Sequence, residues 1–115
     1  MPIRIVDTSI ARADIADVAA RQFGDMVKAV VDLTAAIMAI GGELHSDEEA
    51  ALLERGSRQQ DLWGVNLYPA ESVDTWIEYD SMINVRPSQG NRSRGVDDAD
   101  TREAIRRVVE SLVRD

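Results

Sequence analysis

The stretch MVKAVVDLTAAIMAI, residues 26–40, is a nearly continuous apolar run that the folded chain must bury. Periodicity alone does not separate a buried helix from buried strands in such a run. We predict two strands, at residues 27–33 and 36–40, which turn near Thr34 and Ala35. The first half carries three β-branched valines and the run ends in two glycines, which favours strands. The alanine content favours a helix, which is the alternative.

The length of 115 residues suits one domain with a single core that forms without metal or disulfides. Hydrophobic residues make up 44% of the chain and charged residues 30%, which is typical of a soluble globular protein. The chain has no cysteine, which excludes disulfides, thiolate catalysis and cysteine zinc sites. This absence is compatible with a reducing cytoplasm, where we expect the protein.

Charge and hydropathy limit the classes of partner that the chain is expected to bind. No run approaches the roughly 20 apolar residues of a membrane span, and the N-terminus lacks the pattern of a secretory signal, so we expect no membrane partner. The formal net charge of -8, from 21 acidic and 13 basic residues, repels polyanions. We therefore expect no bulk nucleic-acid binding, and only a local basic patch escapes this argument.

Caps and apolar periodicity predict the remaining elements. Ser46 and Glu49 have the spacing of a capping box, and Gly24 and Gly56 are suitable helix ends. The further predicted elements are strands at 3–6, 61–68 and 76–86, and helices at 11–23, 47–55 and from Asp97 or Asp98 to 113. The order β-α-β-β-α-β-β-α gives an α+β domain with a mainly antiparallel sheet of about four or five strands. We expect its three helices on one face.

Three phrases of the sequence stand out together: FGDMVKAVVD, IMAIGGELHSDEEAALL, and DLWGVNLYP followed by WIEYDSMINVRPSQGNRSRGV. They resemble a small bacterial family of single-domain proteins catalogued as a domain of unknown function. The resemblance runs from about Phe23 to Leu112. It implies a bacterial protein of unknown function, and it implies no activity, cofactor or partner.

The segment INVRPSQGNRSRGVDD, residues 83–98, places three arginines in a polar loop. Two of them lie just before a helix N-terminus, where free amide groups favour anions. Such a loop suits a phosphate, a carboxylate or an acidic protein partner. The alternative is a structural loop whose arginines pair with the aspartates at the helix start. The candidate residues of the anion or partner site are Arg86, Gln89, Asn91, Arg92 and Arg94.

Two further sets of residues are candidates for chemistry. Glu78 and Asp80 project from the same side of the predicted strand and can act as acid and base if one is buried. An exposed sheet face carries the same pattern and is the alternative. If their segment is extended, Glu43, His45 and Asp47 lie on one side of it, as ligands of a divalent metal would. Alternatively, Asp47 complements the helix dipole and His45 only leads into the helix.

We predict a binding or interaction module that forms a homo-oligomer and recognises a small anion or an acidic partner. Its surface joins the loop of Arg86 to Arg94 to a strand face with Asn66, Glu78, Asp80 and Asn84.

The alternative is a small enzyme of unknown reaction, with His45 as general base or metal ligand beside Glu43, Asp61 or Asp80. His45 is the only histidine, and no nucleotide or hydrolase motif is present, so no cofactor is predicted. The enzyme needs His45 and the carboxylates in one cleft, whereas the module needs only an accessible patch.

Overall fold

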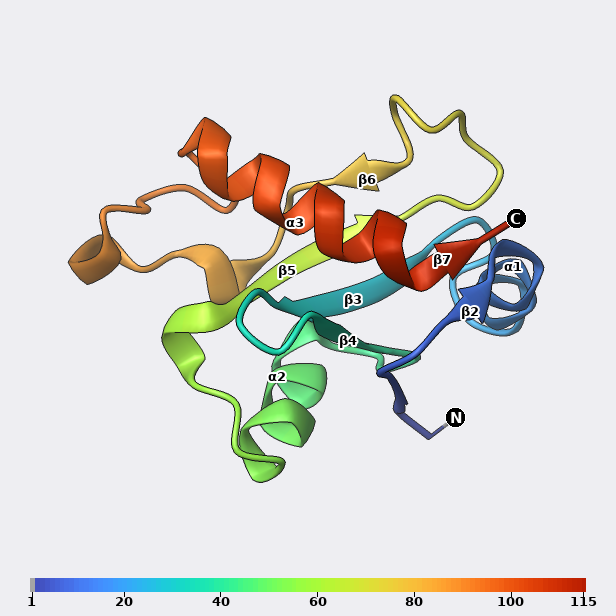
Figure 1. Cartoon of the computed structure of the whole chain (residues 1–115), viewed down its shortest axis with the longest axis horizontal. Coiled ribbons are helices and arrows are strands. Elements are labelled where there is room, and N and C mark those ends of the chain that lie inside the picture. The colour runs from blue at the N-terminus through green and yellow to red at the C-terminus, as the bar shows by residue number, and fades with distance from the viewer. Residues whose placement is uncertain (1) are drawn as a thin grey trace.

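The computed structural model describes residues 2–115, which form a five-stranded antiparallel sheet in the order β1-β4-β3-β5-β6 (Figure 1). The strands of this sheet are β1 (Arg4–Val6), β3 (Val27–Asp32), β4 (Ile37–Ile40), β5 (Leu62–Leu67) and β6 (Ile77–Glu78). The central strand β3 pairs with β4 on one side and β5 on the other. The prediction that the apolar run forms two strands is confirmed.

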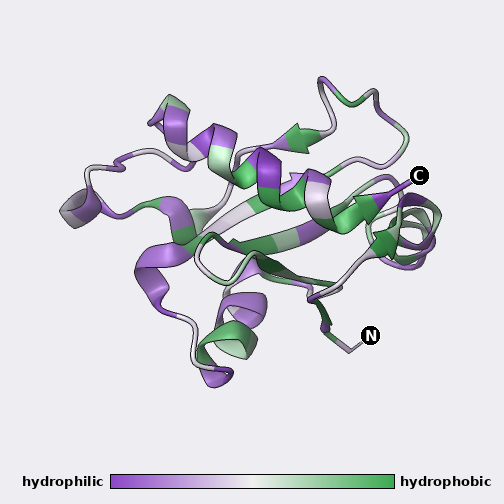
Figure 2. Ribbon diagram, viewed as in Figure 1, coloured by the Kyte–Doolittle hydropathy of each residue, from purple (hydrophilic) through white to green (hydrophobic). Residues whose placement is uncertain are grey.

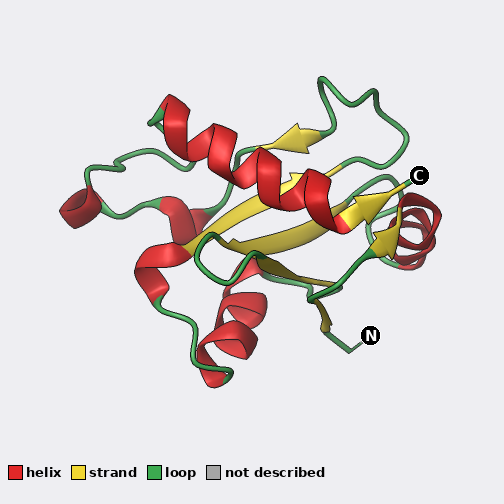
Figure 3. Ribbon diagram, in the orientation of Figure 1, coloured by secondary structure: helices red, strands yellow, loops and turns green. Residues whose placement is uncertain are grey.

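Helices surround the sheet (Figure 3). They are α1 (Arg12–Arg21), α2 (His45–Glu54) and α3 (Ala99–Leu112), with short 3-10 helices η1 (Gln59–Asp61), η2 (Met82–Asn84) and η3 (Pro87–Gln89). Two further strands, β2 (Ile10–Ala11) and β7 (Val113–Arg114), form a parallel pair. This pair joins the start of α1 to the end of α3. The predicted α+β class is confirmed.

The two faces of the sheet have different covers. Val27 and Val31 of β3 belong to the larger core, together with residues of α1 and α3, and the apolar side of α3 faces the sheet (Figure 2). Val30 of the same strand belongs to a smaller core with Leu52 of α2. The prediction that all helices lie on one face is therefore wrong. Since β3 is apolar on both faces, both faces need a cover.

The ends of α1 and α3 follow their sequence signals. Gly24 has a φ of 99° and donates its N–H to Ala19 O at 2.7 Å, which ends α1. Asp98 caps α3, because its side chain accepts from the Thr101 N–H at 3.0 Å. The helices predicted at 11–23 and from Asp97 or Asp98 to 113 are confirmed within a few residues.

The start of α2 differs from the predicted capping box of Ser46 and Glu49. The helix begins at His45, and its N-cap, Leu44, provides no side-chain cap. Glu48 turns back instead, and its Oε2 accepts from the Gly42 N–H at 2.9 Å. A Cβ at Gly42 would lie 2.8 Å from Cγ of Glu48, so only glycine leaves room for this carboxyl.

The predicted strand at 76–86 is wrong beyond Glu78. The chain leaves the sheet there, and the side chain of Asn84 takes the place of a neighbouring strand. Asn84 Oδ1 accepts from the Gly64 N–H at 2.8 Å, and Asn84 Nδ2 donates to Gly64 O at 2.9 Å. This pair of hydrogen bonds satisfies the edge of β5, which would otherwise bury unpaired backbone groups. Ser81 caps the intervening η2 by accepting from the Ile83 N–H.

Replacement of Gly64 by alanine tests this packing. The new Cβ would lie 2.5 Å from Cβ of Ser81, so we expect the free energy of unfolding to fall by about 1–3 kcal/mol or more. Urea unfolding measures the loss.

Gly95→Ala is the control, because its Cβ would meet no neighbour closer than 3.4 Å. We expect that variant to stay within about 0.5 kcal/mol of the parent. Equal losses in the two variants would contradict the proposed clash at Gly64.

Candidate functional site

Two side chains of the predicted anion loop bind the protein's own backbone. Arg86 donates to Leu62 O at 2.6 Å, and its guanidinium carbon lies 4.2 Å from the centroid of the Trp63 ring. Gln89 donates to Gln60 O at 3.2 Å. These contacts fasten the loop to the start of β5. They favour a structural role, and anion binding by these two residues stays a prediction.

Asn91 holds the middle of the same loop together. It is buried, donates to the carbonyls of Asn84 and Gly95, and accepts from the Asp97 N–H at 2.8 Å. Asp97 accepts from the Ser93 hydroxyl and the Arg92 N–H, and these bonds lower its pKa. The Arg92 side chain is different, since it forms no hydrogen bond or ion pair within residues 2–115.

Arg94, in the same loop, lines a cleft. Its Nε donates to Asp80 Oδ1 at 2.7 Å, and both side chains are about half exposed. The cleft has a volume of about 150 Å³ and lies between the first turn of α2 and η2. We call it the His45 cleft. Its lining residues are Lys28, Leu44, His45, Ser46, Ser81, Met82, Ile83 and Arg94.

His45 is a neutral hydrogen-bonding group in this cleft. Its Nε2 lies 2.8 Å from the carbonyl oxygen of Val65, so the neutral ring donates from Nε2 and keeps Nδ1 as an acceptor. Burial lowers the pKa of His45 most, and the charges of Lys28 and Arg94 lower it further against the opposing effects of Val65 O and Asp80. The imidazole is therefore uncharged at neutral pH.

The first turn of α2 adds partial positive charge to the cleft. Leu44 O accepts from the N–H groups of Asp47 and Glu48, so within residues 2–115 only those of His45 and Ser46 lack an acceptor, and no side chain caps them. Burial raises the pKa of Glu48 to about 9, so this carboxyl is uncharged at neutral pH. Asp47, the other acidic residue of this turn, does not line the cleft. The helix start therefore favours an anion in the cleft.

The geometry behind the predicted metal site is absent. Glu43, His45 and Asp47 were expected on an extended segment, but α2 already begins at His45. Glu43 lines a different hollow, with Arg21 and Phe23. Across residues 2–115, no group of three or more His, Asp or Glu side chains is placed to hold a metal ion.

The carboxylates of the predicted enzyme lie apart. Glu78 Oε1 accepts from Asn66 Nδ2 at 2.8 Å and from the Tyr68 hydroxyl at 3.1 Å. Asp80 lies beyond the end of β6 and pairs with Arg94, so the two acids do not share a strand face. None of Glu43, Asp61 and Glu78 lines the His45 cleft. Among the predicted carboxylates, Asp80 is the one whose charge acts on His45, and it is paired with Arg94. Catalysis by His45 stays a prediction.

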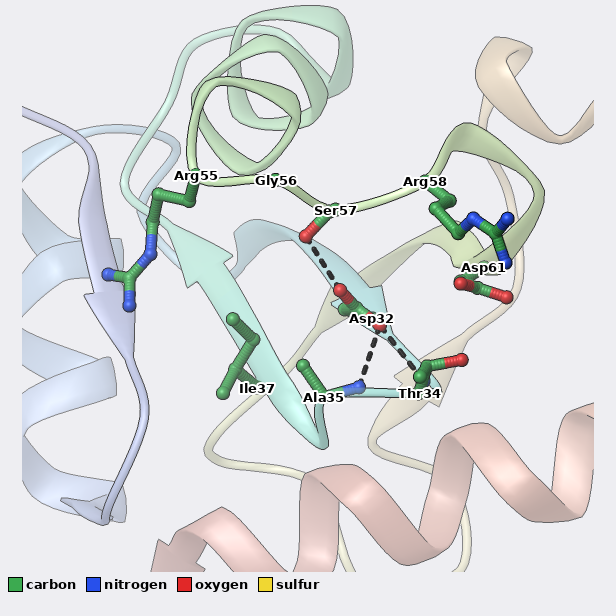
Figure 4. Close-up of a pocket in the computed structure, with 9 residues that line it drawn as sticks. All are labelled: Asp32, Thr34, Ala35, Ile37, Arg55, Gly56, Ser57, Arg58 and Asp61. Atoms are coloured by element: carbon green, nitrogen blue, oxygen red, sulfur yellow. Dashed lines mark hydrogen bonds between the residues drawn. The ribbon is translucent and has the colours of Figure 1, made fainter.

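A second cavity, of about 310 Å³, surrounds Asp32 (Figure 4). Asp32 is 2% exposed and accepts from the N–H groups of Thr34 and Ala35 and from the Ser57 hydroxyl. These bonds fix the turn between β3 and β4 to the segment after α2. The cavity is lined by two arginines and two aspartates, so it offers no excess charge to a ligand. We regard it as structural.

Sequence comparison gives the family. A family model described as "Protein of unknown function (DUF5674)" matches residues 4–112. The chain belongs to this family. No curated protein and no solved structure matches this DUF5674 member. The match confirms the resemblance found in the sequence, and it carries no activity to any residue. No helix formed by residues 2–115 is long and apolar enough to cross a membrane.

The protonated state of Glu48 predicts a pH dependence of stability. The ordinary pKa of this carboxyl is 4.5, and burial raises the pKa in the folded protein to about 9. Between these values unfolding releases a proton, so this group makes the free energy of unfolding fall as pH rises, by up to about 1.4 kcal/mol per pH unit. Glu48→Gln should therefore stabilise the protein more at about pH 8 than at about pH 5.5.

Urea unfolding at both pH values measures this difference. Glu54→Gln is the matched control, since Glu54 is an exposed residue of the same helix and should give no such difference. A Glu48→Gln effect that is the same at both pH values would show that Glu48 is ionised when folded.

Proposed function

We propose that this protein is a binding module that holds a small anion in the His45 cleft. One observation carries the proposal. In a chain with a net charge of -8, the cleft gathers the only lysine, an arginine and an uncapped helix start, and no acidic side chain lines it. The proposal retains the cytoplasmic location and the homo-oligomer expected from the sequence.

The position of Lys28 supports an anion between it and α2. Positive side chains are unfavourable near the N-terminus of a helix, yet Lys28 and the first residues of α2 line the same cleft. Within the described residues Lys28 forms no ion pair, and its ammonium lies 5.4 Å from the centroid of the Phe23 ring. A bound anion removes this repulsion, because it lies between two positive groups.

The position of Arg94 supports the same conclusion. Asp80 engages Nε and thereby orients the guanidinium, while the Nη groups form no hydrogen bond within residues 2–115. An arginine held in this way loses little side-chain entropy when it binds an anion. The small volume of the cleft favours a small anion over an extended acidic polypeptide.

Paired arginine variants test the proposal. Arg94→Gln removes a charge at the cleft, and Arg92→Gln removes the same charge from the same loop outside it. We measure the thermal shift of each variant with sodium acetate, phosphate and sulfate. An anion at 100 times its Kd adds about 2.7 kcal/mol to the stability of the parent protein. We expect Arg94→Gln to lose most of this gain and Arg92→Gln to keep it.

Each variant is compared with itself in the absence of anion, so a change in its own stability does not affect the result. Equal losses in Arg92→Gln and Arg94→Gln would assign the effect to overall charge. A parent protein that none of the three anions stabilises would rule out the proposed function.

A further inference from the structure

Three large apolar side chains that are exposed to solvent lie at or near the His45 cleft. Leu44 and Met82 line the cleft, and they are 54% and 64% exposed. Phe23, which is 42% exposed, lies against Lys28. These three are half of the six large hydrophobic side chains that are exposed in the described part of the chain. Their concentration at one place is typical of a binding surface.

A second hollow adjoins the cleft at Leu44 and is lined by both polar and apolar side chains. It has a volume of about 480 Å³ and is lined by Arg21, Gln22, Phe23, Glu43 and Leu44. Leu44 lines both hollows. Lys28 also connects them, because it lines the cleft while its ammonium lies over the Phe23 ring. A molecule bound at Lys28 therefore lies close to both Leu44 and Phe23.

The charge of the cleft selects among anions. Asp80 pairs with Nε of Arg94 at 2.7 Å and offsets its charge, so Arg94, Asp80 and Lys28 together carry a net charge of about one positive unit while the Nη groups of Arg94 can still donate to an anion. His45 is uncharged, because burial lowers its pKa. One remaining positive charge matches a carboxylate, whereas a phosphate dianion would keep one negative charge unbalanced.

We infer that the ligand of the His45 cleft is a small monocarboxylic acid with an apolar tail. The carboxylate lies among Lys28, Arg94 and the first turn of α2, and the tail lies over Leu44 toward Phe23. This inference rests on the proposed function, since it names the class of anion that the same site binds.

The size of the cleft determines where the tail lies. The cleft, at about 150 Å³, is smaller than the second hollow, at about 480 Å³. The carboxylate occupies the cleft, so a longer tail extends over Leu44 into the second hollow. Each methylene buried there tightens binding by about fourfold.

A chain-length series tests the inference on the full-length protein. Acetate, butyrate, hexanoate and uncharged hexanol are titrated into the isotope-labelled chain, and amide shifts are followed by NMR. We expect shifts at Leu44, His45 and Ser46, and hexanoate at least about tenfold tighter than acetate. Hexanol, which lacks the charge, should bind at least about tenfold more weakly than hexanoate.

Variants separate the head group from the tail. Lys28→Met keeps an unbranched side chain without the ammonium group and should weaken the binding of both acetate and hexanoate. Leu44→Ser should weaken hexanoate alone, to about the affinity of acetate. Leu53→Ser is the matched control, since Leu53 is 40% exposed on α2 and does not line either hollow. It should leave the whole series unchanged.

The outcomes distinguish the two proposals. If acetate and phosphate bind as tightly as hexanoate and require Lys28, the tail is ruled out and the anion site stands. If Lys28→Met and Arg94→Gln each bind hexanoate as tightly as the parent protein does, the site is apolar only and both proposals fail. If light scattering shows a dimer that Leu44→Ser dissociates, the apolar surface belongs to a second copy of the chain, and the inference is overturned.

Discussion

The burial of β3 on both faces is the constraint on which the rest of the structure depends. Because apolar side chains of β3 point to both sides, α3 and α1 cover one face and α2 must cover the other. The face under α2 also carries the two charged residues of β3. Lys28 lines the His45 cleft together with the first residues of α2, and Asp32 accepts a hydrogen bond from Ser57, which follows the end of α2. The same packing thus creates a structural clamp at one end of the helix and a cationic cleft at the other.

The exposed edge of β5 explains most of the polar loop. Strand β6 pairs with only two residues of β5, so side chains must satisfy the remaining backbone groups. Asn84 binds both polar groups of Gly64, and Arg86 binds the carbonyl of Leu62. Polar side chains of the loop therefore satisfy backbone groups at the edge of the sheet. Arg94, held by Asp80, is the arginine that it brings to the cleft.

The sequence predicts the helices and strands that depend on neighbouring residues, and it does not show contacts between residues that are distant in the chain. The strand pair in the apolar run follows from its valines and glycines, and the last helix follows from its apolar stripe and from Asp98. The alternation of residues 76–86 cannot show that Asn84 will bind Gly64, twenty residues away in the chain. At the site, Asp80 is predicted with His45 in the enzyme and with Arg94 in the module, but never all three together, and Lys28 is missed. Its signal was present, because Lys28 is the only lysine and interrupts an apolar strand.

Several features around the start of α2 each oppose stability when taken alone. The helix lacks a side-chain cap, a lysine shares the cleft at its positive end, and Glu48 is buried without a charge partner. Leu44 and Met82, beside them, leave apolar surface in water. The missing cap is shared with α1, whose N-cap Ala11 provides no side-chain cap either, whereas Asp98 caps α3. Natural proteins break such rules at functional sites and offset the cost elsewhere in the fold. The ligand that we infer, an anion with an apolar tail, would compensate three of these features at once, because it would pair with Lys28, bind the free amide groups and cover Leu44.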